Sequence, residues 1–148
     1  MDKEVLNFLT SWKEGILNIS KSYTNKEDYK KEALKFIQEH YLFETESVLF
    51  KPTLTKKILF RNDLHSALSY FIGGSIPEDT GFAIKPWEMI EINEMNNLLE
   101  SNLIISMGVF KFTSYDNNQK TNVAFTFILK PINESFKIKV HHSSIIPS

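Results

Sequence analysis

Imidazole and hydroxyl side chains gather near the end of the chain, in the run His141-His142-Ser143-Ser144. Thr53 and Tyr70 supply two further hydroxyls, and Arg61 supplies a cation between them in sequence. A neutral imidazole exchanges protons near neutral pH, and hydroxyls both donate and accept hydrogen bonds. Brought together, these groups predict a pocket that holds a small oxyanion or relays a proton.

The alternation of side chains along a strand divides the terminal run between two faces. The apolar residues of the segment 136–140 occupy every second position, and continuing that pattern places His142 and Ser144 on the inward face. His141 and Ser143 then point outward, although a β-bulge would reverse the assignment. Because adjacent histidines on a regular strand point apart and no third ligand lies nearby, the pair predicts no metal site and no cofactor.

Each candidate also has a purely structural interpretation. An inward His142 is often a core imidazole that bonds a neighbouring carbonyl, and Tyr70 is often a core aromatic with one hydrogen-bonded hydroxyl. Thr53 follows a proline and fits a turn. Arg61 fits either a structural ion pair or an anion clamp. We expect Asp79 to be a turn residue, and we expect the helical histidines His40 and His65 to lie at the surface.

Hydrophobic periodicity predicts two long helices, a short third helix and an antiparallel meander. The expected helices cover residues 2 to about 20, 24 to about 41 (with Thr24 and Glu27 as a capping box) and 62–72, with Asp2 and Asn62 as N-caps. The expected strands cover residues 82–92, 103–114, 121–130 and 135–144. Helices followed by antiparallel strands indicate an α+β fold, and we expect residues 1–148 to form one domain.

Composition excludes several classes of function. The net charge is −1 and no basic block stands out, so we expect no nucleic-acid partner. No apolar run approaches the ~20 residues that cross a bilayer, so we expect no membrane insertion. Cysteine is absent, which excludes disulfides and cysteine nucleophiles. The first residues lack the pattern of a signal peptide, and we expect a cytoplasmic protein.

An ordered series of short segments resembles one family over about residues 47–146. The chain is similar to the iota-class carbonic anhydrases, which are relatives of the association domain of calmodulin-dependent kinase II within the nuclear transport factor 2-like superfamily. The segments that carry the resemblance are Phe50-Lys51-Pro52-Thr53, Phe60-Arg61, Ala67-Leu68-Ser69-Tyr70-Phe71, Gly81-Phe82-Ala83-Ile84 with Pro86-Trp87, Met107-Gly108, Phe125-Thr126-Phe127 and His141-His142-Ser143-Ser144.

The resemblance implies a cone-shaped fold in which N-terminal helices pack on a curved antiparallel sheet. It implies reversible hydration of carbon dioxide to bicarbonate, without a metal ion in at least some members, and homodimers that pair through the sheet. The matching positions are Thr53, Tyr70 and the run 141–144. On this basis we expect Thr53, Tyr70, His142 and Ser144 to be catalytic. We expect His141, Ser143 and Arg61 to contact the bicarbonate with Thr53 and Tyr70.

The chain departs from the family pattern on two strands. Val109 and Phe110 stand where asparagine and tyrosine are usual, and Ala124 and Phe125 stand where glutamate and tyrosine are usual. These departures keep open a non-catalytic association or small-ligand-binding domain of the same superfamily. An isomerase or cyclase would need an inward carboxylate base, and no strand position offers one.

Overall fold

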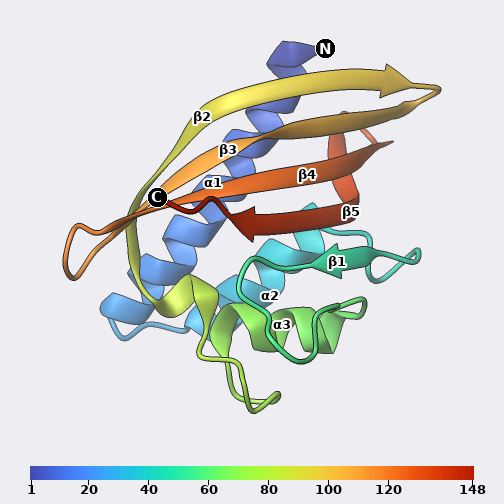
Figure 1. The fold of residues 1–148 in the computed structure, drawn as a ribbon. Helices are drawn as coiled ribbons and strands as arrows, with labels where there is room; N and C mark the ends of the chain where they lie inside the picture. The colour runs from blue at the N-terminus through green and yellow to red at the C-terminus, as the bar shows by residue number, and fades with distance from the viewer.

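The elements of the chain follow the order helices first, sheet last (Figure 1). The computed structural model describes residues 1–148. Its helices are α1 (Asp2–Thr24), α2 (Tyr29–His40), α3 (Leu64–Ile72) and the 3-10 turn η1 (Phe82–Ile84). Its strands are β1 (Leu49–Lys51), β2 (Trp87–Glu100), β3 (Leu103–Ser114), β4 (Lys120–Ile132) and β5 (Ser135–Ile145). The predicted α+β fold is confirmed.

The helices form where the apolar spacing places them, but their N-caps differ from the predicted ones. Asp28 caps α2 by accepting a hydrogen bond from the backbone N–H of Lys31, and Asp63 caps α3 in the same way. Asn62 instead accepts a bond from the backbone N–H of Phe50 at 2.8 Å. Asp2 is the first residue of α1 and makes no cap bond. The three predicted N-caps, Asp2, Thr24 and Asn62, are therefore wrong, although the helices themselves are present.

The five strands form one sheet in the order β1-β5-β4-β3-β2. Neighbours in this sheet are antiparallel, except that the short strand β1 runs parallel to β5. The predicted first strand begins later than expected, because residues 82–84 form η1 and the strand starts at Trp87. The parallel pairing of β1 with β5 was not predicted, because a strand of three residues is too short to show the alternation of a strand.

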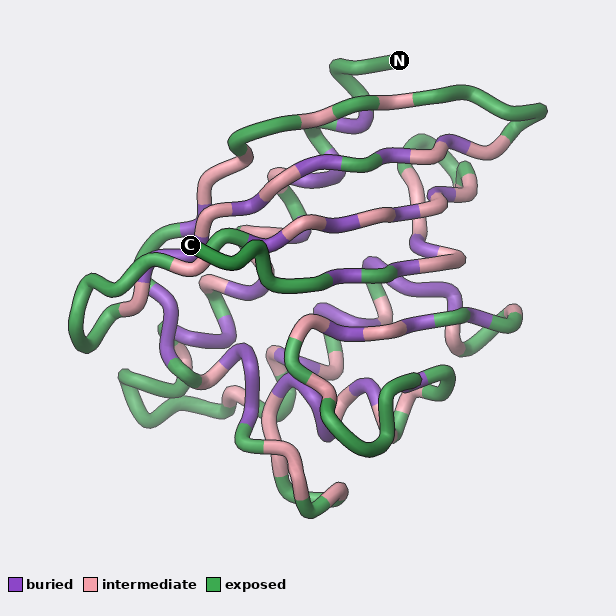
Figure 2. Tube along the Cα trace, in the orientation of Figure 1, coloured by how far each residue is buried: buried purple, intermediate pink, exposed green.

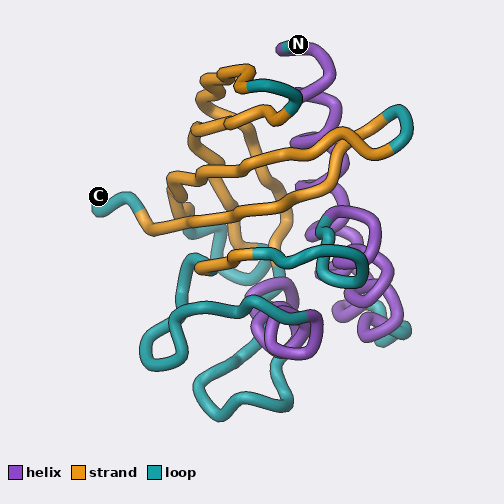
Figure 3. The backbone as a smooth tube through the Cα atoms, turned by 90° about the vertical axis from the view of Figure 1, so that its right-hand side faces the viewer, coloured by secondary structure: helices purple, strands orange, loops and turns teal.

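The long helices cover one face of the sheet and leave the other open (Figures 1 and 3). An aromatic core fills the space between the layers. Trp12 of α1 stacks on Phe110 at a centroid distance of 5.1 Å, and Phe110 stacks on Phe125 at 4.6 Å. His40 also belongs to this core, because it is only 4% exposed, so its predicted surface position is wrong. The core thus backs the inward face of strands β3, β4 and β5.

No helix of the structure combines the length and apolar character that crossing a membrane requires.

Candidate functional site

A bulge in β5 decides which residues of the terminal run face the interior. Val140 pairs with Ile128 and Ile138 pairs with Leu129, so Lys139 between them has no partner across the ladder. The extra residue shifts the alternation by one position. His141 is consequently buried while its neighbour His142 is exposed. Buried and exposed stretches of chain alternate along β5 (Figure 2).

The prediction that His142 and Ser144 face inward is therefore wrong. His141 and Ser143 are 4% and 3% exposed, and they form the inward pair. His142 and Ser144 line a hollow of about 370 Å³ on the outer face of the sheet, together with Thr126. A bulge was expected to reverse the two faces, but a lysine at position 139 gives no signal that a bulge occurs there.

Tyr70 and Thr53 form a second group of hydroxyls on the opposite wall of the interior. Tyr70 lies on α3, and its hydroxyl oxygen accepts a hydrogen bond from the backbone N–H of Leu54 at 3.1 Å. Burial raises the pKa of Tyr70 well above its usual value, and hydrogen bonds from Leu54 and the Thr53 side chain offset this in part. Tyr70 therefore keeps its proton at neutral pH and is a hydrogen-bond donor rather than a base.

A pocket of about 220 Å³ opens beside the Tyr70 ring. Leu54 and Phe82 contribute apolar surface to it, and Glu78, Asp79 and Lys85 contribute charged groups. Its volume is suited to small molecules rather than to a large cofactor, since pockets that hold drug-sized ligands measure about 300–1,000 Å³.

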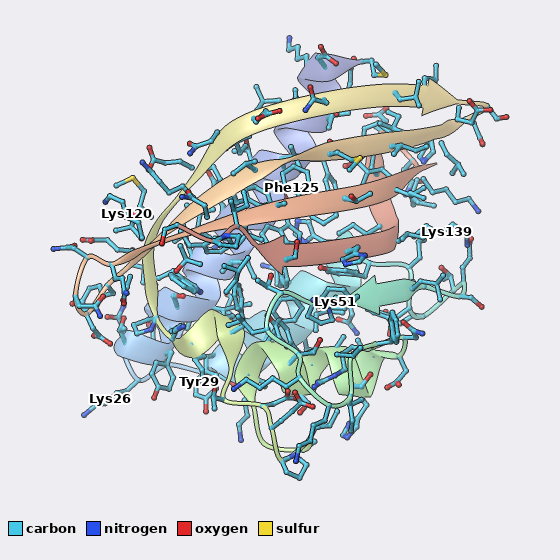
Figure 4. All side chains as sticks on the ribbon, in the orientation of Figure 1. Lys26, Tyr29, Lys51, Lys120, Phe125 and Lys139 are labelled. Carbon is cyan, nitrogen blue, oxygen red and sulfur yellow. The ribbon has the colours of Figure 1, made fainter.

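Strand β1 joins the Tyr70 wall to the β5 wall. Phe50 stacks on the His141 ring at 4.7 Å and meets the Tyr70 ring edge-on at 6.2 Å. The next residue, Lys51, donates from Nζ to the backbone carbonyl of Ser143 at 3.1 Å. Figure 4 labels Lys51 on β1, beside β5. Burial lowers the pKa of Lys51. The parallel pairing of β1 and β5 therefore places Thr53, Tyr70, His141 and Ser143 around one end of the sheet.

The inward pair is backed by a buried hydrogen-bond chain that the sequence did not reveal. Trp12 Nε1 donates to the Tyr41 hydroxyl at 3.2 Å, and that hydroxyl lies 2.9 Å from Nδ1 of His141. Nε2 of His141 lies 2.7 Å from Oγ of Ser143. Tyr41 and His141 are 100 positions apart in sequence, so no local pattern connects them.

His141 is neutral in this environment. Burial lowers the pKa of His141 well below its usual value, and the neighbouring His142 contributes in the same direction. A neutral imidazole has one N–H donor and one acceptor nitrogen, and here both nitrogens have a hydroxyl within hydrogen-bond distance.

Arg61 forms a buried ion pair, and its geometry does not fit the predicted contact with bicarbonate. The side chain is 0% exposed, and Nη1 and Nη2 bond to Asp79 at 2.6 and 2.8 Å. Nε donates to the carbonyl of Ile58, and Nη1 also donates to the carbonyl of Ser66. Hydrogen bonding to Asp79 raises the pKa of Arg61. Every guanidinium nitrogen thus has a protein acceptor.

The sequence predicted Asp79 only as a turn residue, but its carboxylate also makes tertiary contacts. It also accepts a bond from the Ser69 hydroxyl at 2.6 Å, and Ser69 accepts from the backbone N–H of Ile76 at 2.9 Å. Arg61 and Asp79 together tie the loop after β1 to α3 and to the loop that follows it. Since that first loop carries Thr53, the ion pair positions part of the site without contacting it.

The departures from the family pattern fall on both faces of the sheet. Phe110 and Phe125 are buried and face the helices, where they stack on each other. Val109 and Ala124 pair across β3 and β4 and line the outer hollow. The inner wall is therefore apolar at Phe110 and Phe125, where the resemblance had implied tyrosines.

No group of three or more histidine, cysteine, aspartate or glutamate side chains is arranged to hold a metal ion.

Comparison with known proteins assigns the chain to a family. The family model described as metal-independent carbonic anhydrase matches residues 3–145. The chain belongs to the metal-independent carbonic anhydrase family. A metal-independent carbonic anhydrase from Nostoc sp. is 33% identical over 149 residues, which span 97% of this chain and 73% of the relative.

Solved structures confirm the fold of this metal-independent carbonic anhydrase family member. The iota-carbonic anhydrase from a cyanobacterium, complexed with bicarbonate, matches with a TM-score of 0.92 and 32% identity, covering 100% of this chain and 93% of that one. A calcium/calmodulin-dependent protein kinase II association domain from Xanthomonas campestris matches at 0.72 with 19% identity, covering 100% and 89%. A nuclear transport factor 2-like protein from Shewanella oneidensis matches at 0.55 with 15% identity, covering 97% and 98%. The predicted nuclear transport factor 2-like fold is confirmed.

Proposed function

We propose that this chain catalyses the reversible hydration of carbon dioxide to bicarbonate, with Thr53, Tyr70 and Ser143 holding the anion. The observation that carries the proposal is the match at a TM-score of 0.92, over 100% of this chain, to an enzyme complexed with bicarbonate. The inward hydroxyl of Ser143 and the hydroxyls of Tyr70 and Thr53 are the donors for such an anion. His141 and Ser143 replace His142 and Ser144 in this proposal, because only the first pair faces the interior.

The chemistry requires donors and a route for one proton. The oxygen of water attacks the carbon of carbon dioxide and forms a C–O bond, while one C=O π pair moves onto a carbon dioxide oxygen, which gains negative charge. The attacking water gives up one proton to solvent water or buffer, and bicarbonate results. Hydroxyl donors that are fixed before the reaction stabilise that charge without reorganisation. Tyr70 meets this requirement because its raised pKa keeps it protonated.

His141 orients Ser143 and does not store the proton. Its lowered pKa disfavours the imidazolium, so a proton that reached it would leave quickly. His142 retains access to solvent, but it does so from the other face of the sheet. A stored proton at His142 would therefore be separated from the proposed site by the β5 backbone.

Stopped-flow carbon dioxide hydration on chelator-treated protein tests the proposed function directly. We expect hydration above the buffer rate that survives dialysis against a chelator, with no further gain when zinc is added. The reason is that the proposed donors are protein hydroxyls, which chelation does not remove. Activity that appears only after zinc is added would contradict the proposal.

A non-catalytic small-anion-binding domain is the second candidate. The observation that favours it is the apolar stack of Phe110 and Phe125, which offers no hydroxyl to water on that wall. Binding of ¹³C-labelled bicarbonate, followed by NMR, separates the two candidates. Saturable binding with no hydration above background would favour the binding domain, whereas turnover excludes it.

We also infer that the chain forms a homodimer through the outer face of its sheet. The long helices cover only the inner face (Figure 3). The outer face carries two cross-strand rows, Val109–Ala124–Ser144 and Met107–Thr126–His142. These are mostly small or apolar, and Met107 is 54% exposed. A face of this kind favours burial against a matching face on a second copy. A cytoplasmic location stays a prediction from the sequence.

Met107→Asp is expected to convert the dimer to a monomer, because it would place a carboxylate from each copy in the apolar interface. Sedimentation velocity measures the change. Leu6→Asp is the matched control, since Leu6 is a 43% exposed apolar residue on α1, away from the sheet face. A wild-type monomer, or a Met107→Asp protein that remains dimeric, would contradict the inferred interface.

A further inference from the structure

Four side chains from three distant segments form one continuous buried hydrogen-bond chain. It runs from Trp12 of α1 through Tyr41, which follows α2, to His141 and Ser143 of β5. Trp12, Tyr41, His141 and Ser143 are each at most 4% exposed. Because these groups are buried, the direction of each bond depends on the donors and acceptors packed around them and on any ligand that reaches Ser143.

The direction of the bonds follows from counting protons. Trp12 Nε1 is a donor only, so the Tyr41 oxygen accepts this bond. The Tyr41 hydroxyl proton then has one acceptor within reach, which is Nδ1 of His141 at 2.9 Å. A neutral His141 that accepts at Nδ1 carries its proton on Nε2, and Nε2 donates to Ser143 Oγ. The hydroxyl proton of Ser143 has no protein acceptor and remains available to a ligand.

The opposite direction leaves the Tyr41 proton, rather than the Ser143 proton, without a partner. If Ser143 donated to Nε2, His141 would carry its proton on Nδ1 and donate to the Tyr41 oxygen. That oxygen would then accept two bonds, and the Tyr41 proton would have no acceptor. Each arrangement thus leaves one hydroxyl proton without a protein acceptor, that of Ser143 in the first and that of Tyr41 in the second. An anion bound at Ser143 accepts the Ser143 proton, whereas Tyr41 lies behind His141, so anion binding favours the first arrangement by roughly one to two powers of ten.

We propose that Tyr41 is a positioning residue that holds His141 as the Nε2–H tautomer and thereby directs the Ser143 hydroxyl proton toward the bound anion. The inference rests on the proposed function of Ser143 as a bicarbonate ligand. Tyr41 itself is behind His141 and contacts no substrate. It acts through the His141 imidazole, because it disfavours the arrangement in which the Ser143 hydroxyl donates to His141.

Ring packing keeps the imidazole in the orientation that this relay needs. His141 stacks on Phe50 at 4.7 Å and meets the edge of Phe127 at 4.3 Å. Tyr41 stacks on Phe43 at 5.5 Å and is held at its hydroxyl by Trp12. Burial also raises the pKa of Tyr41 far above neutrality, so its hydroxyl stays a donor.

The protein contains an internal reference for the tautomer measurement. His40 is also buried, but its Nδ1 lies 2.8 Å from the carbonyl oxygen of Phe36, which only accepts. His40 therefore carries its proton on Nδ1, and its Nε2 accepts from the Ser11 hydroxyl at 2.8 Å. One spectrum of the ¹⁵N-histidine-labelled protein should thus show two buried neutral imidazoles of opposite tautomer.

The first test is a long-range ¹H–¹⁵N correlation on the wild-type protein saturated with bicarbonate. We expect His141 as the Nε2–H tautomer and His40 as the Nδ1–H tautomer, assigned by His141→Gln and His40→Gln. This readout does not require activity, so it stands even if the chain hydrates no carbon dioxide. A wild-type His141 with its proton on Nδ1 would overturn the inference.

The second test compares Tyr41→Phe with the matched control Ser11→Ala. Tyr41→Phe removes one hydroxyl and keeps the ring, and we expect a mixture of His141 tautomers and a bicarbonate affinity lower by roughly twofold to tenfold. Ser11→Ala removes the hydroxyl beside the other buried imidazole, and it should change the His40 signals only. Thermal melting confirms that both variants are folded. A folded Tyr41→Phe protein with wild-type His141 signals and wild-type bicarbonate affinity would overturn the inference.

Discussion

Ser143→Ala is expected to lower the kcat of carbon dioxide hydration by about 100-fold, whereas Ser144→Ala is expected to leave it unchanged. Removing one positioned donor to a developing oxyanion costs on the order of 2.7–4 kcal/mol of barrier. Ser143 faces the interior at 3% exposure and lies 2.7 Å from Nε2 of His141, while Ser144 is exposed on the outer face of the sheet. The two variants make the same chemical change one residue apart, so each controls for the other.

Stopped-flow hydration and ¹³C-bicarbonate binding measure this difference. Ser143→Ala should weaken bicarbonate binding as well as turnover, because the hydroxyl contacts the anion in both states. The reverse result, a large loss in Ser144→Ala and none in Ser143→Ala, would show that the bulge at Lys139 does not set the inward face. Equal and small effects in both variants would remove the terminal serines from the site.

Asp79→Ala is expected to lower the free energy of unfolding by about 3–5 kcal/mol, which is a large part of the stability of a domain of this size. The change leaves the guanidinium of Arg61 buried at 0% exposure without its carboxylate partner. It also removes the acceptor of the Ser69 hydroxyl. The loop that carries Thr53 should lose its anchor, so we expect hydration activity to fall with stability.

Glu46→Ala is the matched control for this prediction. Glu46 also pairs with cations, Lys130 and Lys139, but its side chain and both lysine side chains are 28–35% exposed. Exposed pairs contribute about 0–1 kcal/mol, so urea denaturation of Glu46→Ala should differ little from wild type. A loss of less than about 1 kcal/mol in Asp79→Ala would show that the buried pair is not a principal support of the loop.

Local patterns were sufficient to predict most of the elements. The spacing of apolar residues predicted α1 and α2, and alternation predicted strands β3, β4 and β5 to within a few residues. Both signals repeat over several turns or several strand pairs, so an error at one residue does not change the result. The short strand β1 and the turn η1 offer too few repeats, and both were missed.

The sequence selected the residue types of the candidate site but did not determine their orientations or partners. Thr53, Tyr70 and the run 141–144 were selected from the sequence. However, one unpaired residue at Lys139 exchanged the inward and outward members of that run. Arg61 was selected as an anion ligand, yet its charge is satisfied by Asp79, which the sequence suggested only as a turn residue. Partners separated by long stretches of chain leave no local signal.

The sequence by itself determined the α+β order of elements, the absence of cysteine chemistry and the set of hydroxyls and imidazoles from which a site can be built. Only the tertiary structure decided that His141 and Ser143 face inward, and that Tyr41 and Trp12 stand behind them. The physical reason is that periodicity records which positions are buried on average. The direction of a single side chain depends on a bulge, and the direction of a buried hydrogen bond depends on every donor and acceptor packed around it.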